Sequence, residues 1–269
     1  MAEPLLPGLE CPAVFGHRGY SAAAPENTMS AFHACIEHRI RGIELDVHLC
    51  ASGELVVIHD HDTQRITGVK GIVEEMTLKE LKDLDVGSWF SPEFRDEKIP
   101  TLEEVFSAFG DRLYYNIELK SRSKKDFGLA ETTCRLIERF SLTRRCIVSS
   151  FNPLQIRFVE KHSLDHAATS VIFADDPEVP KILRHGFGRV LVDARILQVE
   201  HAQITPEWFK RFHDRKGYRV IGWTMDDPQV IQRAVQLGID AYISDDPKQA
   251  EILIRDYSAP PKQPVLQSV

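Results

Sequence analysis

The most constraining feature of this sequence is a repeated alternation of short β-rich runs with amphipathic stretches of helical periodicity. The β-rich runs are Val14–His17, Ile43–Leu49, Leu55–Ile58, Tyr114–Leu119, Cys146–Ser150, Thr169–Phe173, Val190–Asp193, Val220–Trp223 and Ala241–Ser244. The amphipathic stretches are Thr28–His38, Thr101–Phe109, Asp126–Phe140, Pro153–His162, Pro206–Lys216, Pro228–Leu237 and Lys248–Tyr257. Strands that alternate with helices form parallel sheets with helical crossovers, so the pattern predicts an α/β fold.

One connection in this series is too short for a helical crossover. Only the five residues Cys50–Glu54 separate Ile43–Leu49 from Leu55–Ile58, whereas a parallel crossover needs about a dozen residues or more. We therefore expect a hairpin that turns at Ser52–Gly53. Without the returning strand, eight parallel strands remain, which is the number that closes a (β/α)₈ TIM barrel.

The chain length fits one such domain. The chain has 269 residues, and a (β/α)₈ barrel takes about 250. We expect a single catalytic barrel over residues 13–257, a small cap inserted after the hairpin over about 61–98, and a flexible tail over 258–269. In the cap, Thr77 has the sequence context of a capping box. Trp89 and Phe90 either form the core of the cap, which we favour, or contact the leaving group of a substrate.

Composition excludes several classes of protein. With 43% hydrophobic and 27% charged residues and a net charge of −7, the chain is globular and has no electrostatic footprint for nucleic acid or anionic membranes. No apolar run approaches the about 18 residues of a membrane span, and the N-terminus does not resemble a signal peptide. The five cysteines contain no Cys-x-x-Cys pair, which favours buried thiols and a cytoplasmic location.

Acidic side chains interrupt two of the predicted barrel strands. Glu44 and Asp46 lie two residues apart, so both project from one face of their strand, and Glu118 repeats the pattern in the next barrel strand. Three oxygen ligands without nearby Cys or His favour Mg²⁺ or Ca²⁺ over Zn²⁺. The alternative is a set of ion pairs with Arg18 and Lys120 that involves no metal.

Two histidines lie at the ends of predicted strands. His17 precedes Arg18, whose planar fork of donors suits a phosphate, and His59 follows the returning strand of the hairpin. Two such groups can remove one proton and donate another, so together with a cation they predict phosphodiester cleavage. We expect the other histidines on the surface or in packing, with His61 the hardest to assign: His33, His38, His48, His61, His162, His166, His185, His201 and His213.

These motifs, taken in order, resemble the glycerophosphodiester phosphodiesterase family. The matching segments are His17–Gly19, Ala24–Thr28, Glu44–Val47, His59–Asp60, Trp89–Phe90, Ile99–Glu104, Glu118–Lys120, Ser149 with Phe151, Trp223–Thr224 and Ile243–Asp245. Each segment alone is a weak signal, but their joint order and spacing cover most of residues 13–255.

The resemblance implies a TIM-barrel hydrolase that uses a divalent cation, Mg²⁺ or Ca²⁺, to release an alcohol and sn-glycerol 3-phosphate from small glycerophosphodiesters. By position, it assigns His17 and His59 to catalysis; Glu44, Asp46 and Glu118 to the metal; Arg18 and Lys120 to the phosphate; and Trp223 to the glycerol or leaving-group side.

Two alternative functions remain open. A lysophospholipase D would use the same catalytic set on a lysophospholipid, although the sequence contains no membrane anchor. A non-catalytic barrel that binds phosphodiesters would be indicated by loss of the assigned catalytic or metal residues, and all of them are present. The sequence leaves open the leaving-group alcohol, the metal, the role of each histidine, the choice between cyclic-phosphate formation and direct water attack, and the oligomeric state.

Overall fold

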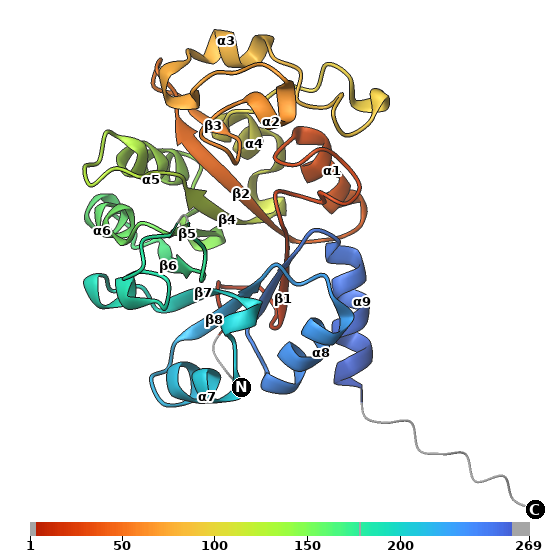
Figure 1. The fold of residues 1–269 in the computed structure, drawn as a ribbon, viewed down its shortest axis with the longest axis vertical. Helices are drawn as coiled ribbons and strands as arrows, with labels where there is room; N and C mark the ends of the chain where they lie inside the picture. Colours follow the sequence, from red (N-terminus) through yellow and green to blue (C-terminus); the bar gives the residue numbers. More distant parts are fainter. Residues whose placement is uncertain (1–3, 178, 260–269) are drawn as a thin grey trace, which may run out of the picture.

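The computed structural model describes residues 4–177 and 179–259. In this part of the chain, eight parallel strands form a closed barrel with helices around its outside (Figure 1). The strand order is β1-β9-β8-β7-β6-β5-β4-β2, and pairing of β1 with β2 closes the barrel. The strands are β1 (Ala13–Gly16), β2 (Gly42–Leu49), β4 (Tyr114–Leu119), β5 (Cys146–Ser150), β6 (Ala168–Phe173), β7 (Ile196–Glu200), β8 (Arg219–Trp223) and β9 (Ala241–Ser244). The predicted (β/α)₈ barrel is confirmed.

The ninth strand of the sheet, β3 (Leu55–Val57), returns antiparallel along β2 and lies outside the barrel. Val47 lies opposite Val57, and Leu49 lies opposite Leu55. The turn contains Gly53 with a φ of 96°, in the left-handed region that favours glycine. The short connection therefore forms the hairpin expected from its length.

Nine α-helices are present among the described residues. They are α1 (Met29–Glu37), α2 (Gln64–Thr67), α3 (Leu78–Asp83), α4 (Leu102–Phe109), α5 (Leu129–Arg139), α6 (Pro153–His162), α7 (Pro206–Phe209), α8 (Pro228–Leu237) and α9 (Pro247–Ser258). The predicted bounds of α6 and α8 agree with the structure. The stretch predicted as one helix over Pro206–Lys216 instead divides into α7 and a π-helical turn, Lys210–Asp214.

The seventh barrel strand was predicted in the wrong place. Val190–Asp193 is not a strand, because it overlaps a 3₁₀ turn, Phe187–Leu191, whose Val190 side chain is 56% exposed. The strand is β7, which contains the buried polar residue Gln198. Its Oε1 accepts a hydrogen bond of 2.9 Å from Asn116 Nδ2 of β4, across the barrel interior. Barrel closure supplies this partner, so hydrophobicity along the chain could not indicate that Gln198 is buried.

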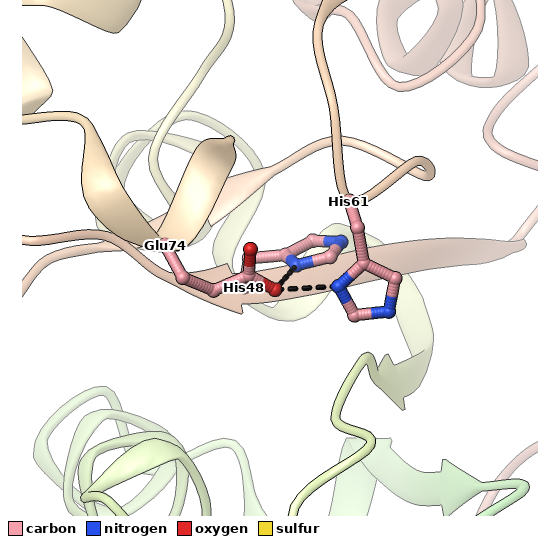
Figure 2. Close-up of side chains that lie close together, drawn as sticks. All are labelled: His48, His61 and Glu74. Atoms are coloured by element: carbon pink, nitrogen blue, oxygen red, sulfur yellow. Dashed lines mark hydrogen bonds and ion pairs between the residues drawn. The ribbon is translucent and has the colours of Figure 1, made fainter. Parts of the chain in front are cut away.

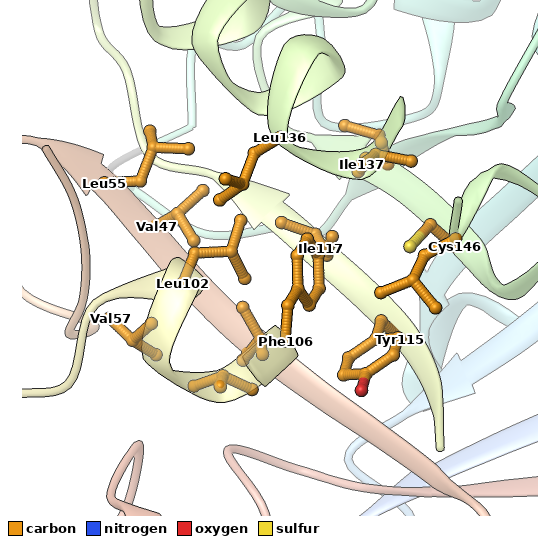
Figure 3. Close-up of a cluster of buried hydrophobic side chains, with 14 of the residues drawn as sticks. Val47, Leu55, Val57, Leu102, Phe106, Tyr115, Ile117, Leu136, Ile137 and Cys146 are labelled. Atoms are coloured by element: carbon orange, nitrogen blue, oxygen red, sulfur yellow. The ribbon is translucent and has the colours of Figure 1, made fainter. Parts of the chain in front are cut away.

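The two faces of β2 serve different purposes. Leu45 and Val47 point outward into an apolar core that also contains Leu102 and Phe106 of α4 (Figure 3). The alternate residues therefore point into the barrel, as the period of two along a strand requires. Packing of one face against the helices fixes the register of the strand, and this places the acidic residues of the other face inside the barrel.

The segment predicted as a cap forms a separate group of short elements at one end of the barrel, next to β2 and β3 (Figure 1). It contains α2, α3 and two 3₁₀ turns, Val73–Glu75 and Pro92–Phe94. Thr77 makes the predicted capping box with Glu80. Trp89 is 44% exposed, so the expectation that it belongs to the cap core was wrong. Of the predicted tail, Ser258 ends α9, and residues 260–269 lie outside the described residues.

The cysteines follow their prediction with one exception. Cys35, Cys50, Cys134 and Cys146 are buried, whereas Cys11 is exposed in the loop before β1, so the expectation of burial was wrong for Cys11. No helix within the described ranges is both long and apolar enough to cross a membrane.

Candidate active site

Three carboxylates meet inside the barrel, on two neighbouring strands. Glu44 and Asp46 come from β2 and Glu118 from β4. The register pairs Asp46 directly with Glu118, so the two side chains project from the same face of the sheet. One oxygen from each of the three carboxylates lies within 4.8 Å of the others, and all three residues are buried. We call this group the carboxylate cluster.

Two cationic side chains neutralise part of this cluster. Lys120 Nζ lies 2.8 Å from Glu118 Oε1 and 3.3 Å from Asp46 Oδ1, and Arg18 Nε lies 3.7 Å from Asp46 Oδ2. Asn27 Nδ2 also donates a hydrogen bond of 2.8 Å to Asp46 Oδ2. Burial raises the pKa of Asp46, but Lys120, His59 and Arg18 outweigh it and hold that pKa well below its ordinary value. Asp46 is therefore ionised at neutral pH.

Glu44 is in the opposite electrostatic situation. Its Oε2 accepts a 3.0 Å hydrogen bond from the backbone N–H of Arg18, but no cationic side chain forms an ion pair with it among the described residues. Burial, and then the charges of Asp46 and Glu118, raise its pKa well above the ordinary value. The cluster thus has more acidic groups than the two cations pair with, and its oxygen donors fit a hard divalent cation.

Each of the two predicted catalytic histidines is held by an aspartate. His17 Nδ1 lies 2.6 Å from Asp245 Oδ1, and His59 Nδ1 lies 2.6 Å from Asp60 Oδ1. When Nδ1 carries a hydrogen, its N–H donates a hydrogen bond to the carboxylate. Nε2 is then the nitrogen that is available for proton transfer. His17 directly follows β1, while Ile58, next to His59, donates its backbone N–H to the carbonyl of Asp46. Both histidines are therefore positioned by strands that adjoin the carboxylate cluster.

A network of charges supports Arg18 and His59 from the side of the cap. Arg18 Nη1 donates to Glu26 Oε1 at 2.8 Å. Arg65 donates to both oxygens of Glu26, at 2.6 and 2.9 Å, and to Asp60 Oδ2 at 2.6 Å. The sequence indicated no chemical role for Glu26 and did not identify Arg65. Arg65 lies in α2 and meets the other members only through the fold, so no local pattern indicated its role.

Among the buried side-chain donors without a hydrogen-bond partner within the described ranges, two belong to predicted substrate contacts. They are Arg18 Nε and Trp223 Nε1. Trp223 is the last residue of β8, and its ring lies edge-on to that of Phe151, with centroids 5.7 Å apart. Buried donors without partners are costly, so each is a candidate contact for an oxygen of a bound ligand.

Fold and site together define a barrel enzyme whose chemistry is concentrated at the carboxyl-terminal ends of the strands. Its carboxylates suit a cation, its Arg and Lys suit a phosphate, and its two histidine–aspartate pairs suit proton transfer. Residues 17–249 match the sequence profile of the glycerophosphoryl diester phosphodiesterase family, and the chain belongs to that family. The predicted family and enzyme class are confirmed.

Relatives of similar length support the same assignment. A glycerophosphodiester phosphodiesterase from Caldanaerobacter subterraneus is 35% identical over 249 residues, which cover 90% of this chain and 97% of that protein. One from Bacillus altitudinis is 32% identical over 240 residues, 88% of this chain and 96% of that protein. A phosphodiesterase of Oleispira antarctica, solved in complex with the product sn-glycerol-3-phosphate, is 27% identical with a TM-score of 0.77, covering 91% of this chain and 97% of that one.

Proposed function

We propose that this enzyme hydrolyses glycerophosphodiesters to an alcohol and sn-glycerol 3-phosphate in a reaction that depends on Mg²⁺ or Ca²⁺ and on His17 and His59. The observation that carries the proposal is the position of a partly neutralised carboxylate cluster beside two histidines that are each held by an aspartate. The product bound by the Oleispira antarctica relative fits this substrate class.

Glu44, Asp46 and Glu118 would hold the cation. A divalent cation bound there supplies positive charge that polarises the phosphate and stabilises the charge built up in the transition state. Arg18 and Lys120 bind and orient the phosphate; Arg18 offers its Nε–H, which has no hydrogen-bond partner among the described residues. The indole N–H of Trp223 likewise has no hydrogen-bond partner among the described residues, and it is offered to the glycerol or leaving-group side of the substrate.

Proton transfer falls to the two histidines. One Nε2 removes a proton from the nucleophile that attacks phosphorus, which is either a water or the 2-hydroxyl of the glycerol. Attack by the 2-hydroxyl gives a cyclic phosphate, which a water then opens to sn-glycerol 3-phosphate. The other Nε2 donates a proton to the oxygen of the departing alcohol, so that the P–O bond breaks without release of an alkoxide. Asp245 and Asp60 keep each ring in the orientation that presents Nε2 and stabilise its charged form.

The first test replaces each histidine in turn. His17→Ala and His59→Ala should each lower kcat/KM by about 10²–10⁴-fold, the usual contribution of a general acid or base. Circular dichroism and the unfolding midpoint should stay near those of the unchanged protein. His185→Ala is the matched control, because this histidine is exposed, and it should retain full activity. Near wild-type turnover by the His59→Ala protein would show that the two-histidine scheme is wrong.

The second test defines substrate and metal together. Turnover is measured on glycerophosphodiesters of choline, ethanolamine, glycerol and inositol and on one lysophospholipid, each with Mg²⁺, Ca²⁺ or a chelator. We expect the chelator to abolish hydrolysis and one of the two cations to restore it. Activity that survives complete chelation would contradict the metal dependence. Fast release from the lysophospholipid alone would instead identify a lysophospholipase D.

A further inference from the structure

A second group of metal-binding side chains lies outside the carboxylate cluster. His48 comes from β2, His61 from the chain after β3, and Glu74 from the 3₁₀ turn Val73–Glu75 of the cap segment (Figure 2). Glu74 Oε1 lies 2.8 Å from His48 Nδ1 and 2.6 Å from His61 Nδ1. The sequence predicted both histidines as surface or packing residues. We call these three residues the histidine–glutamate cluster.

The surroundings of His48 offer its ring more hydrogen-bond acceptors than a neutral imidazole has donors. Its side chain is 0% exposed, and its other ring nitrogen, Nε2, lies 3.2 Å from the backbone carbonyl oxygen of His59. Both ring nitrogens therefore face oxygen acceptors, whereas a neutral imidazole has only one N–H to donate. A ring protonated on both nitrogens would satisfy both contacts, but it would place a second cation-type ring, beside His61, on the single carboxylate of Glu74.

A bound cation resolves this conflict. The Nε2–H of His48 then donates to the His59 carbonyl, and the lone pair of Nδ1 coordinates the metal together with Glu74. A metal-bound histidine very often donates its second ring N–H to a backbone carbonyl in this way, which fixes the tautomer and orients the ring. Burial of Glu74 raises its pKa, but the bonds with His48 and His61 outweigh it and hold that pKa below its ordinary value, so the third ligand is ionised.

The donor set selects the kind of metal. Two imidazole nitrogens and one carboxylate oxygen suit Zn²⁺, whereas oxygen donors alone suit Mg²⁺ or Ca²⁺. The three ligand atoms lie within 4.8 Å of one another. Zinc bonds of about 2.0–2.1 Å in a tetrahedron place ligands roughly 3.3 Å apart. The ligand atoms of Glu74 and His61 lie only 2.6 Å apart, so these two side chains must separate by roughly 0.7 Å. Both are partly exposed, at 36% and 28%, which also leaves room for water as a fourth ligand.

We propose that His48, His61 and Glu74 form a zinc-binding site, separate from the carboxylate cluster, that joins the cap segment to the barrel. Zn²⁺ at this site ties strand β2 to the chain after β3 and to the 3₁₀ turn Val73–Glu75. It also fixes the carbonyl of His59 through His48 Nε2, so the site holds the backbone of a proposed catalytic residue. The proposal does not depend on the proposed function.

Zinc binding to the full-length protein tests the proposal. The protein carries Cys11→Ser, which removes the exposed thiol, and Glu44→Gln, which weakens the carboxylate cluster as a competing site. Gln imitates the neutral form of Glu44, whose raised pKa makes this substitution mild. After removal of metals by chelation, Zn²⁺ is titrated calorimetrically in the presence of excess Mg²⁺. We expect one Zn²⁺ per chain and a rise in Tm of about 5 °C or more at saturating Zn²⁺.

Variants of the two partly exposed ligands test whether the bound zinc lies at the histidine–glutamate cluster. His61→Ala and Glu74→Gln should each weaken Zn²⁺ binding by at least about tenfold and remove the rise in Tm. They are preferred to His48 variants, because His48 is buried and its loss could prevent folding. Glu75→Gln is the matched control, because Glu75 is the sequence neighbour of Glu74 and its side chain is exposed. This substitution should leave both the Zn²⁺ affinity and the rise in Tm unchanged. Zn²⁺ affinity that is equal in the Glu74→Gln and Glu75→Gln proteins, or the absence of binding at micromolar Zn²⁺, would overturn the proposal.

Discussion

At the scale of single residues, an aspartate holds each proposed catalytic histidine through Nδ1. Asp60 is the sequence neighbour of His59, whereas Asp245 follows β9 and lies 228 residues from His17. Burial raises the pKa of Asp245, but its hydrogen bond with His17 outweighs this effect and lowers that pKa below its ordinary value. Asp245 also accepts a 3.1 Å hydrogen bond from Ser21 Oγ, so both partners orient it. We infer that Asp245 positions His17.

Replacement of Asp245 tests this positioning role. Asp245→Asn keeps the shape of the side chain but removes the charge that stabilises a protonated His17 ring. We expect kcat to fall by at least about tenfold while KM changes much less, because the substrate contacts remain. Steady-state kinetics on the best glycerophosphodiester give both values. Asp256→Asn, on the exposed side of α9, is the control and should behave as the unchanged protein. An unaltered kcat in the Asp245→Asn protein would contradict the role.

At the scale of elements, side-chain caps define where the helices begin after the strands. Thr101 precedes α4, and its Oγ1 accepts from the N–H of Glu104 at 3.1 Å, while the Glu104 carboxylate accepts from the N–H of Thr101 at 2.7 Å. Thr101 also forms an antiparallel β-bridge with Val56 of β3. The capping box of Thr101 and Glu104 thus fixes the start of α4. It also fixes the place where the chain returns from the cap segment to the barrel.

Loss of this capping box should lower the free energy of unfolding by a measurable amount. Thr101→Ala removes one half of the capping box, and we expect the free energy of unfolding to fall by about 1 kcal/mol. Urea denaturation followed by circular dichroism measures it. Ser107→Ala, on the exposed face of the same helix, is the control and should change stability by less than about 0.5 kcal/mol. Equal stability of the two variants would show that the capping bonds contribute nothing net.

At the scale of the whole molecule, ion pairs join the cap segment to the barrel rim and to the loops around it. These partners, and His17 in the case of Asp245, lower the pKa of several carboxyl groups below the ordinary value, against burial where it is present: Glu26, Asp60, Glu74, Glu104 and Asp245. Folding therefore favours the charged form of each. Their contribution to stability is complete above the unfolded pKa values of about 4 and is lost as pH falls toward the folded values.

This linkage predicts a fall in stability in acid. We expect the free energy of unfolding to decrease by about 1–3 kcal/mol between about pH 5 and pH 3, after allowance for solvent screening at the exposed pairs. Glu44, whose pKa is raised, acts with the opposite sign, and it acts mainly above its ordinary value of 4.5, where the folded group is still protonated and the unfolded group is not. Arg65→Gln removes the partner of Glu26 and Asp60, so its acid-dependent loss should be smaller. Urea denaturation of both proteins across this pH range measures the free energy of unfolding. A free energy of unfolding that does not change between pH 5 and pH 3 would contradict the linkage.

Local chemistry along the chain was sufficient to predict most of the architecture. Alternating strand and helix patterns, one connection too short for a crossover, and the two-residue spacing of Glu44 and Asp46 led to the barrel, the hairpin and the shared face of the carboxylates. These features are local because periodicity and loop length act between near neighbours. The strand β7 was misplaced because its buried Gln198 is satisfied by Asn116 from the other side of the barrel.

The sequence by itself determined the family, the barrel and the residues proposed for catalysis and metal binding. Only the tertiary structure decided which distant groups support them. Asp245 reaches His17 because β9 and β1 are neighbours once the barrel closes, and Arg65 reaches Glu26 because the cap segment lies against the rim. His48, His61 and Glu74 likewise meet only where β2, the hairpin return and the cap segment come together. Contacts between distant residues depend on how the chain closes, so no local pattern predicts them.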